Sequence, residues 1–145
     1  ISTGGALGIG CLANALTALR PHVTGELVCV FGCGGDRDAG KRPEMAREAE
    51  RLADRVVVTD DNPRSEDPET IARNILAGFT DAARVSVIHD RAEAIQSTIR
   101  SATPNDVVLI AGKGHEAYQE IAGQKYPFSD AEQVRHVLKL NGGVA

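Results

Sequence analysis

The chain of 145 residues is poor in aromatic side chains, which make up 3% of it, and it has no tryptophan. A core without large rings must be aliphatic, built chiefly from Val, Ile, Leu and Ala. The length is that of one domain and is sufficient for such a core. Hydrophobic residues make up 42% and charged residues 25% of the sequence, which is ordinary for a globular protein.

An excess of positive charge is also missing, since the formal net charge is −4. Domains that bind nucleic acid normally carry a basic patch, so we expect no nucleic-acid partner. No apolar stretch is long enough to span a bilayer, and no basic cluster precedes an apolar run near the first residue. We therefore expect neither a membrane segment nor a secretory signal.

The three cysteines, Cys11, Cys29 and Cys33, are odd in number and lack the spacing of metal ligands. This pattern predicts reduced thiols in a cytoplasmic protein and no metal site. Cys29 lies in an apolar run, as expected for a small core residue. Cys33 lies in a glycine-rich loop, where a structural role is favoured over a catalytic one.

Short apolar runs alternate with helical patterns along the chain. The runs are typical of strands buried on both faces and cover Leu27–Phe31, Val56–Thr59, Val85–Ile88 and Val107–Ala111. Helices are expected over Cys11–Leu19, from Pro43, and after the capping residues Asp67, Asp90 and Ser129. A turn at 122–124 predicts a hairpin within 118–128. The predicted fold class is α/β and Rossmann-like: a mostly parallel sheet, helices on both faces and an antiparallel edge hairpin.

Charged residues and glycines gather in three loops, 32–42, 60–67 and 112–116, each directly after a predicted strand. The opposite strand ends carry only plain turns. In open parallel sheets, ligands bind at the carboxyl ends of the strands. The sequence therefore predicts a site there with several cations, at least one carboxylate and glycine backbone.

The residue types in these loops suit a charged amino acid. Arginine presents a planar fork that holds a carboxylate or phosphate with two bonds, and Arg37 and Arg64 offer two such forks. Glu116 could accept an ammonium group. The alternative interpretation is an ion-pair network on the surface, without a ligand.

Lys41 and Arg42 stand at a predicted helix start, where a cation is unfavourable unless an anion is near. A phosphate or carboxylate would satisfy them, and solvated charge is the default alternative. His115 is either catalytic or a loop histidine bonded to backbone. The other histidines, His22, His89 and His136, are expected at the surface without partners.

Two stretches resemble dinucleotide-binding loops without completing the pattern. Residues 3–10 resemble the T-G-x-x-x-G-x-G loop of short-chain dehydrogenases, but no strand precedes them and the Tyr-x-x-x-Lys pair is absent. After Gly32, the third glycine of G-x-G-x-x-G is replaced by Arg37. We therefore predict an atypical glycine-rich segment at 1–10 and one domain at 11–145, with no dinucleotide cofactor.

Three motifs taken together resemble the C-terminal, amino-acid-binding domain of the Mur ligase family, in particular its diaminopimelate-adding members. They are Phe-Gly-Cys-Gly-Gly-Asp-Arg-Asp at 31–38 with Lys-Arg-Pro at 41–43, Asp-Asn-Pro-Arg at 61–64, and Gly-Lys-Gly-His-Glu at 112–116 with Tyr-Gln at 118–119. The resemblance runs from about residue 11 to the end. It implies an ATP-dependent amide ligase of peptidoglycan synthesis, in which ATP forms an acyl phosphate and the amine of meso-diaminopimelate attacks it.

The resemblance also implies residue roles. Arg64 would bind the distal carboxylate of diaminopimelate, and lysine-adding relatives lack this arginine. The implied diaminopimelate contacts are Arg37, Asp61, Asn62, Arg64, Gly112 and Glu116. Possible contacts to ATP or phosphate are Lys41, Arg42, Lys113 and His115.

The sequence has no G-x-x-x-x-G-K-[ST] motif for ATP. The family's Asp-Tyr-Ala-His-x-Pro segment would fall near residues 4–10, which read Gly-Gly-Ala-Leu-Gly-Ile-Gly. The resemblance thus implies that ATP, Mg and the UDP-MurNAc-dipeptide are handled by other domains, that no cofactor is assigned to these residues, and that they are inactive alone. Two alternatives stay open: a free-standing Rossmann-like nucleotide-binding module, and a non-catalytic remnant.

Overall fold

The centre of the molecule is a parallel sheet of four strands, seen in a computed structural model that describes residues 8–113 and 116–140. The strands are β1 (Leu27–Phe31), β2 (Arg55–Val58), β3 (Val85–Val87) and β4 (Val107–Ile110). They lie in the order β3-β2-β1-β4, so β1 pairs with both β2 and β4. The predicted parallel sheet is confirmed.

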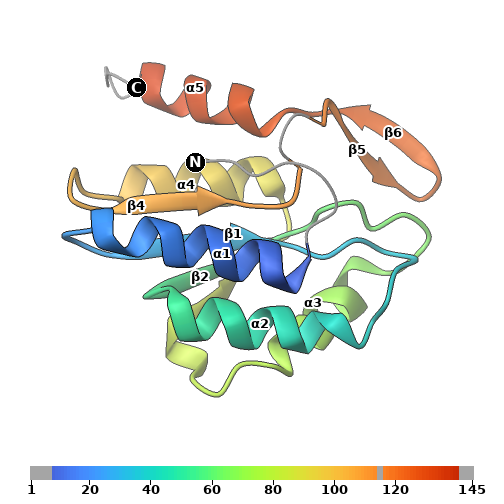
Figure 1. Cartoon of the computed structure of the whole chain (residues 1–145). Helices are drawn as coiled ribbons and strands as arrows, with labels where there is room; N and C mark the ends of the chain where they lie inside the picture. Colours follow the sequence, from blue (N-terminus) through green and yellow to red (C-terminus); the bar gives the residue numbers. More distant parts are fainter. Residues whose placement is uncertain (1–7, 114–115, 141–145) are drawn as a thin grey trace.

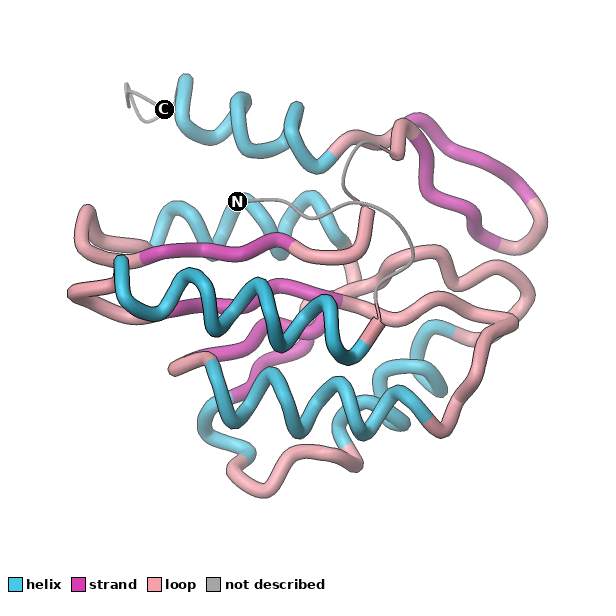
Figure 2. Tube along the Cα trace, viewed as in Figure 1, coloured by secondary structure: helices cyan, strands magenta, loops and turns pink. Residues whose placement is uncertain are grey.

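Helices cover both faces of this sheet (Figures 1 and 2). One face carries α1 (Ile9–Leu19), α2 (Lys41–Leu52) and α3 (Pro68–Leu76), and the other carries α4 (Arg91–Ser101) and α5 (Asp130–Leu140). Short 3-10 turns occupy Arg20–His22 and Ala82–Arg84. None of the helices in the described part of the chain is long and apolar enough to cross a membrane.

The alternation of side chains along β1 explains the two layers. All five residues of this strand are buried. Cys29 and its alternate neighbours pack toward α1, α2 and α3, whereas Val28 and Val30 pack toward α4 and α5. A central strand with helices on both faces must be apolar at every position, which is the pattern that the sequence shows.

The helix starts follow from their capping residues. Asp67 accepts a hydrogen bond from the backbone of Glu69, and Asp90 accepts one from the backbone of Glu93 at 3.2 Å. The hydroxyl of Ser129 accepts one from the backbone of Glu132. The caps predicted at these three positions are confirmed, and they place α3, α4 and α5 directly after loops that border the sheet.

The hairpin is confirmed as β5 (Tyr118–Ile121) and β6 (Gln124–Pro127), which form a two-stranded antiparallel sheet of their own. It lies beyond the carboxyl ends of the parallel strands (Figure 1). A single parallel bridge joins Arg64 to Ile121, with Arg64 N donating to Glu120 O at 3.0 Å and Ala122 N donating to Arg64 O at 2.7 Å. Backbone hydrogen bonds therefore attach the hairpin to the loop after β2.

Two predictions outside the three polar loops are wrong. The run at 85–88 is not a buried strand, because β3 lies at the edge of the sheet and Val87 is 36% exposed. His89 is not without partners: its Nδ1 lies 2.7 Å from Asp60 Oδ1 and its Nε2 lies 3.2 Å from Glu69 Oε1. Both errors arise because an apolar run and a lone histidine do not reveal their neighbours in space.

Candidate functional site

A cavity of about 490 Å³ opens at the carboxyl ends of the strands, beside the point between β1 and β4 where the crossover connections change face. Its walls come from the three predicted loops, the start of α2 and the hairpin: Gly32, Cys33, Gly34, Arg37, Asp38, Lys41, Arg42, Met45, Asp61, Asn62, Arg64, Gly112, Glu116 and Tyr118. The structure thus brings together the six residues that the resemblance assigns to diaminopimelate.

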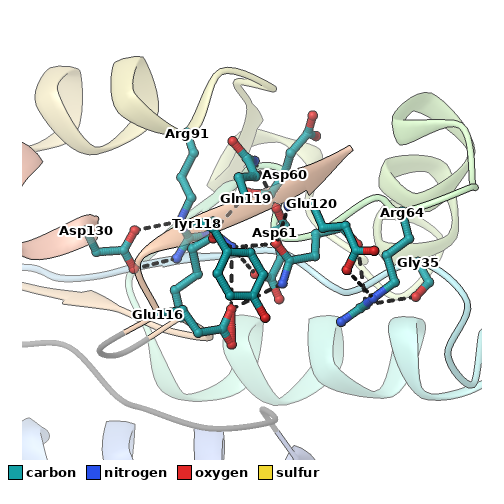
Figure 3. A network of polar contacts seen from close by, with 12 residues as sticks. Gly35, Asp60, Asp61, Arg64, Arg91, Glu116, Tyr118, Gln119, Glu120 and Asp130 are labelled. Atoms are coloured by element: carbon teal, nitrogen blue, oxygen red, sulfur yellow. Dashed lines mark hydrogen bonds and ion pairs between the residues drawn. The ribbon is translucent and has the colours of Figure 1, made fainter. Parts of the chain in front are cut away.

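Arg64 holds its side chain against the rim of this cavity. Its Nη1 donates to the backbone oxygen of Gly35 at 3.0 Å, and its Nε lies 3.5 Å from Glu120 Oε1 (Figure 3). Nη2 makes no hydrogen bond to any described residue, and the side chain is 22% exposed. The Nε and Nη1 atoms of the guanidinium are therefore held by protein groups, while Nη2 remains available to a ligand.

The backbone of Arg64 has φ of +54°, in the left-handed region that side chains other than glycine seldom adopt. Such a conformation costs on the order of 1 kcal/mol and persists only where surrounding contacts fix it. The two backbone hydrogen bonds to the hairpin supply that constraint. The hairpin thus holds Arg64 in a conformation that the loop alone would avoid.

Arg37 and Lys41 are the exposed cations of the cavity. Arg37 donates from Nη1 to the neighbouring backbone oxygen of Asp36 at 3.2 Å, and makes no bond to another loop within the described residues. Lys41 begins α2 and is also exposed. Both side chains can reach an anion without first breaking an ion pair.

Arg42 behaves differently from its neighbour, because it is only 2% exposed. It binds both oxygens of Glu66 at 3.0 Å, Asn74 Oδ1 at 3.0 Å and the backbone oxygen of Gly34 at 3.1 Å. The hydrogen bonds from Arg42 are the main reason why the pKa of Glu66 lies below its usual range. Solvated charge, the default expectation for this arginine, is wrong: its guanidinium joins the loops after β1 and β2.

Asn62 and Lys113 form the buried centre of the site, with Asn62 4% and Lys113 0% exposed. Lys113 Nζ donates to Asn62 Oδ1 at 2.7 Å and to the backbone oxygen of Tyr118 at 3.0 Å. Asn62 Oδ1 also accepts from the backbone of Glu120 at 2.9 Å, and Nδ2 donates to Glu116 Oε1 at 3.2 Å. Because ammonium and backbone N–H only donate, they fix which end of the amide faces Glu116.

The carboxylates of Asp61 and Glu116 form the acidic side of the cavity. Lys113 Nζ lies 3.3 Å from Asp61 Oδ1 and 3.6 Å from Glu116 Oε1. Asp61 Oδ1 is buried and accepts no hydrogen bond from the described residues. Figure 3 shows Glu116 and Asp61 on one side and Arg64 on the other. These two carboxylates are therefore separated from Arg64, whose own acidic neighbour is Glu120.

Cys33 lines the cavity without chemical activation. Burial raises the pKa of its thiol to about 12, and the nearby Arg42 only partly offsets this. Its Sγ lies 3.7 Å from Met45 Sδ. Since the thiolate is the nucleophilic form, this cysteine is a packing residue.

Several residues that shape the site are not among the predicted site residues. Tyr118 lines the cavity, Glu120 holds Arg64, and Glu66 holds Arg42. Asp36 accepts a hydrogen bond from Ser65 Oγ at 2.6 Å, and this bond is the main reason why the pKa of Asp36 is lowered. Asp36 and Tyr118 stand in or beside the motifs, but the contacts of these residues span the loops, so no local pattern gave their tasks. His115 lies outside the described residues.

Few groups among the described residues are placed to hold a metal ion or a phosphate. Among them, no group of three His, Cys, Asp or Glu side chains could hold a metal ion. Of the cations assigned to phosphate, Arg42 and Lys113 are buried in internal contacts, which leaves Lys41 as the accessible one in the described part.

Comparison with known proteins gives a family. Residues 10–114 match the family model described as Mur ligase, glutamate ligase domain. The chain is 58% identical over 127 residues to the UDP-N-acetylmuramoyl-L-alanyl-D-glutamate–2,6-diaminopimelate ligases of Ectopseudomonas mendocina and Pseudomonas aeruginosa, and 57% identical to that of Coxiella burnetii. Each match covers 88% of this chain but 26% of the relative, so the chain spans about a quarter of the length of these proteins.

Solved structures give the same picture. One described as a UDP-N-acetylmuramoyl-L-alanyl-D-glutamate–2,6-diaminopimelate ligase superimposes with a TM-score of 0.92 at 42% identity, covering 99% of this chain and 29% of the other. A bifunctional folylpolyglutamate synthase/dihydrofolate synthase from Yersinia pestis, complexed with AMPPNP and Mn, matches 94% of this chain and 27% of its own with a TM-score of 0.57. At 15% identity, the second match shows the fold alone.

Proposed function

The chain belongs to the Mur ligase family, and on this premise we propose that it is the amino-acid-binding domain of a ligase that adds meso-diaminopimelate to UDP-MurNAc-L-Ala-D-Glu. The names of the relatives that share 57–58% of its residues support this substrate. In the proposed reaction, ATP activates a carboxyl group of the nucleotide-linked peptide as an acyl phosphate. The amine of diaminopimelate displaces the phosphate. The domain's task is to hold the amine component.

The observation that carries the proposal is the placement of Arg64. Its backbone is held at φ of +54°, its guanidinium is anchored through Nε and Nη1, and Nη2 is left for a ligand at the rim of the cavity. A charged N–H donor held in place in this way fits a carboxylate, which diaminopimelate has at the end distant from the reacting amine and lysine lacks. We propose Arg37 as a second contact to the same amino acid.

The acidic side of the cavity supports the same orientation. Asp61 and Glu116 have two negative charges, of which the ammonium of Lys113 offsets one. The remaining charge suits the ammonium group of an amino acid whose carboxylate lies on Arg64. We propose that Gly112, directly beside Asp61, contributes backbone to this end. Asn62 would act by holding Glu116 in place.

ATP, Mg²⁺ and the UDP-sugar peptide enter the proposal only for the longer ligase. The chain covers about a quarter of its relatives, and its described residues offer Lys41 as an accessible cation for phosphate. A ligase that uses these precursors would work in the cytoplasm. Its expected partners are therefore small molecules rather than nucleic acid or membrane.

A binding experiment with matched amino acids tests the proposal. The 145-residue chain is titrated with meso-diaminopimelate and with L-lysine, and binding is followed by NMR. We expect lysine to bind on the order of tenfold more weakly, because it offers no carboxylate to Arg64. Arg64→Lys should weaken the binding of diaminopimelate by a similar factor and leave the binding of lysine unchanged.

Arg73→Lys is the matched control, since Arg73 lies exposed on α3 away from the cavity. It should leave both affinities unchanged. Equal affinity for the two amino acids would remove the assignment of Arg64. Saturable binding of ATP without binding of either amino acid would favour a nucleotide-binding module instead.

A further inference from the structure

A buried ion pair lies behind the acidic side of the cavity without lining it. Arg91 is the first residue of α4 and Asp130 the first of α5, and they are 1% and 0% exposed. Arg91 Nε donates to Asp130 Oδ1 at 2.7 Å and Nη2 donates to Oδ2 at 2.8 Å. The bidentate pair joins the start of the helix that follows the hairpin to the sheet (Figure 3).

The remaining donors of Arg91 reach the ends of two strands. Nη1 donates to the backbone oxygen of Asp60 at 3.2 Å, and Nη2 donates to that of Ala111 at 3.2 Å. The next residues along the chain are Asp61 and Gly112, which both line the cavity. They face each other closely, since a Cβ on Gly112 would lie 3.6 Å from Asp61 Oδ2. One guanidinium thus holds the two backbone segments that form this side.

Stability alone is a poor reason for this arrangement. An arginine in the first turn of a helix opposes the helix dipole. Replacing a buried ion pair with apolar side chains of similar volume is often neutral or stabilising, because desolvating two charges is costly. What the guanidinium provides, and apolar side chains could not, is a fixed spacing between two carbonyl groups on different strands.

We propose that Arg91 is a positioning residue for ligand selection: together with Asp130 it sets the spacing of Asp61 and Gly112, and thereby favours ligands with an ammonium group at that end. The inference rests on the proposed function and deepens it. Arg64 should not depend on Arg91, because its anchors are Gly35 and the hairpin residue Glu120. Figure 3 shows Arg91 and Arg64 on opposite sides of Asp61.

The central experiment replaces both members of the pair with apolar residues of similar size, as Arg91→Met with Asp130→Leu. The 145-residue chain and this double variant are titrated by NMR with meso-diaminopimelate and with pimelate, which has the same two terminal carboxylates and no amino group. We expect the double variant to bind diaminopimelate on the order of tenfold more weakly, and pimelate within about twofold of the parent chain. Its thermal midpoint should match or exceed that of the parent.

Two further variants separate positioning from folding. Arg91→Lys keeps the charge but lacks the planar fork, so it should show the same selective loss of diaminopimelate binding. This variant replaces the double variant in the test if the double variant does not fold. Arg100→Met removes an exposed arginine from the same helix and should change neither affinity. The inference would be overturned if the double variant bound both ligands more weakly by the same factor, or if neither affinity changed.

A readout without ligand keeps the two proposals distinguishable. In the double variant, the backbone amide signals of Asp61 and Gly112 should shift, while those of Gly35 and Arg64 stay in place. If the parent chain binds neither ligand, the proposed function fails and these signals still test the role of Arg91. Unchanged signals at Asp61 and Gly112 would show that Arg91 does not position them.

Discussion

At the scale of single residues, two glycines allow the loops of the site to meet. A Cβ on Gly35 would lie 1.8 Å from the backbone oxygen of Pro63, and one on Gly32 would lie 2.0 Å from that of Thr59. In this close packing Gly35 N donates to Asn62 O at 2.8 Å. Glycine is therefore required at these two positions of the loop after β1, because the backbones are in contact there.

Gly35→Ala should therefore destabilise the chain by about 2 kcal/mol or more, because the neighbouring backbone must move to admit the methyl group. Urea unfolding measures the change. Gly10→Ala is the control, because Gly10 lies within α1 with no atom near its Cβ position. Alanine there should raise the free energy of unfolding by about 0.5–1 kcal/mol. Equal stability of Gly35→Ala and the parent chain would contradict the close approach.

The contacts of single residues also explain why the sequence could name candidate residues but not assign their tasks. The sequence grouped Lys41, Arg42 and Lys113 as possible phosphate contacts. Burial separates them: Lys41 is exposed, whereas Arg42 and Lys113 are enclosed by partners from other loops. A charge in a motif predicts a polar site, but its free donors depend on neighbours that are distant in sequence.

At the scale of elements, the edge strand β3 is held to its neighbours by a histidine. His89, just after β3, lies between Asp60 after β2 and Glu69 in the first turn of α3. The hydrogen bond with Asp60 is the main reason why the pKa of His89 is raised above 6.5, and burial raises the pKa of Asp60. The protonated imidazole therefore links three elements.

A raised histidine pKa in the folded state means that protonation favours folding. This stabilisation is fully present below the ordinary histidine pKa of about 6.5 and is lost as pH rises through the higher folded value. The raised pKa of Asp60 acts in the same direction, starting from a more acidic pH. Rising pH should thus weaken the attachment of β3 and α3.

His89→Asn tests this. Between about pH 6 and pH 8, the parent chain should lose part of its unfolding free energy as pH rises, and the variant should lose less. Urea unfolding at several pH values measures both slopes. His136→Asn, exposed on α5, is the control and should keep the parent slope. Identical slopes for the parent and His89→Asn would contradict the bridge.

At the scale of the whole molecule, topology places the site. The order β3-β2-β1-β4 puts the loops after β1 and β4 side by side, and the loop after β2 beside them. The hairpin and α5 then close the side next to β4. Lys113 and Asn62 bind the backbone of the hairpin, and the Arg91–Asp130 pair binds the start of α5. The cavity is therefore a property of the complete fold and of no single motif.

Because the chain spans about a quarter of its relatives, its catalytic contribution is best tested within a ligase. The 145-residue chain alone should form no amide from ATP, meso-diaminopimelate and the UDP-linked dipeptide. Placed in the Pseudomonas aeruginosa relative instead of the matching segment, it should support ligation. Arg64→Lys in this hybrid should raise KM for diaminopimelate on the order of tenfold and leave KM for ATP within about twofold.

Arg73→Lys in the same hybrid controls for the loss of an arginine and should leave both constants unchanged. An unchanged KM for diaminopimelate in the Arg64→Lys hybrid would exclude this arginine from binding the amino acid. Catalysis by the isolated chain would show that it contains more of the ligase machinery than we propose.

The sequence by itself determined the fold class and the edge of the sheet that carries the polar loops. Continuous apolar runs such as Leu27–Phe31 require burial on both faces, and this depends on local composition. Tertiary structure decided that β3 is an exposed edge strand and that Asn62, Arg42 and Lys113 are committed internally, whereas Arg64 keeps Nη2 available among the described residues. The physical reason is that hydrogen-bond partners are chosen by proximity: Lys113 binds Asn62, which is 51 residues away in the chain.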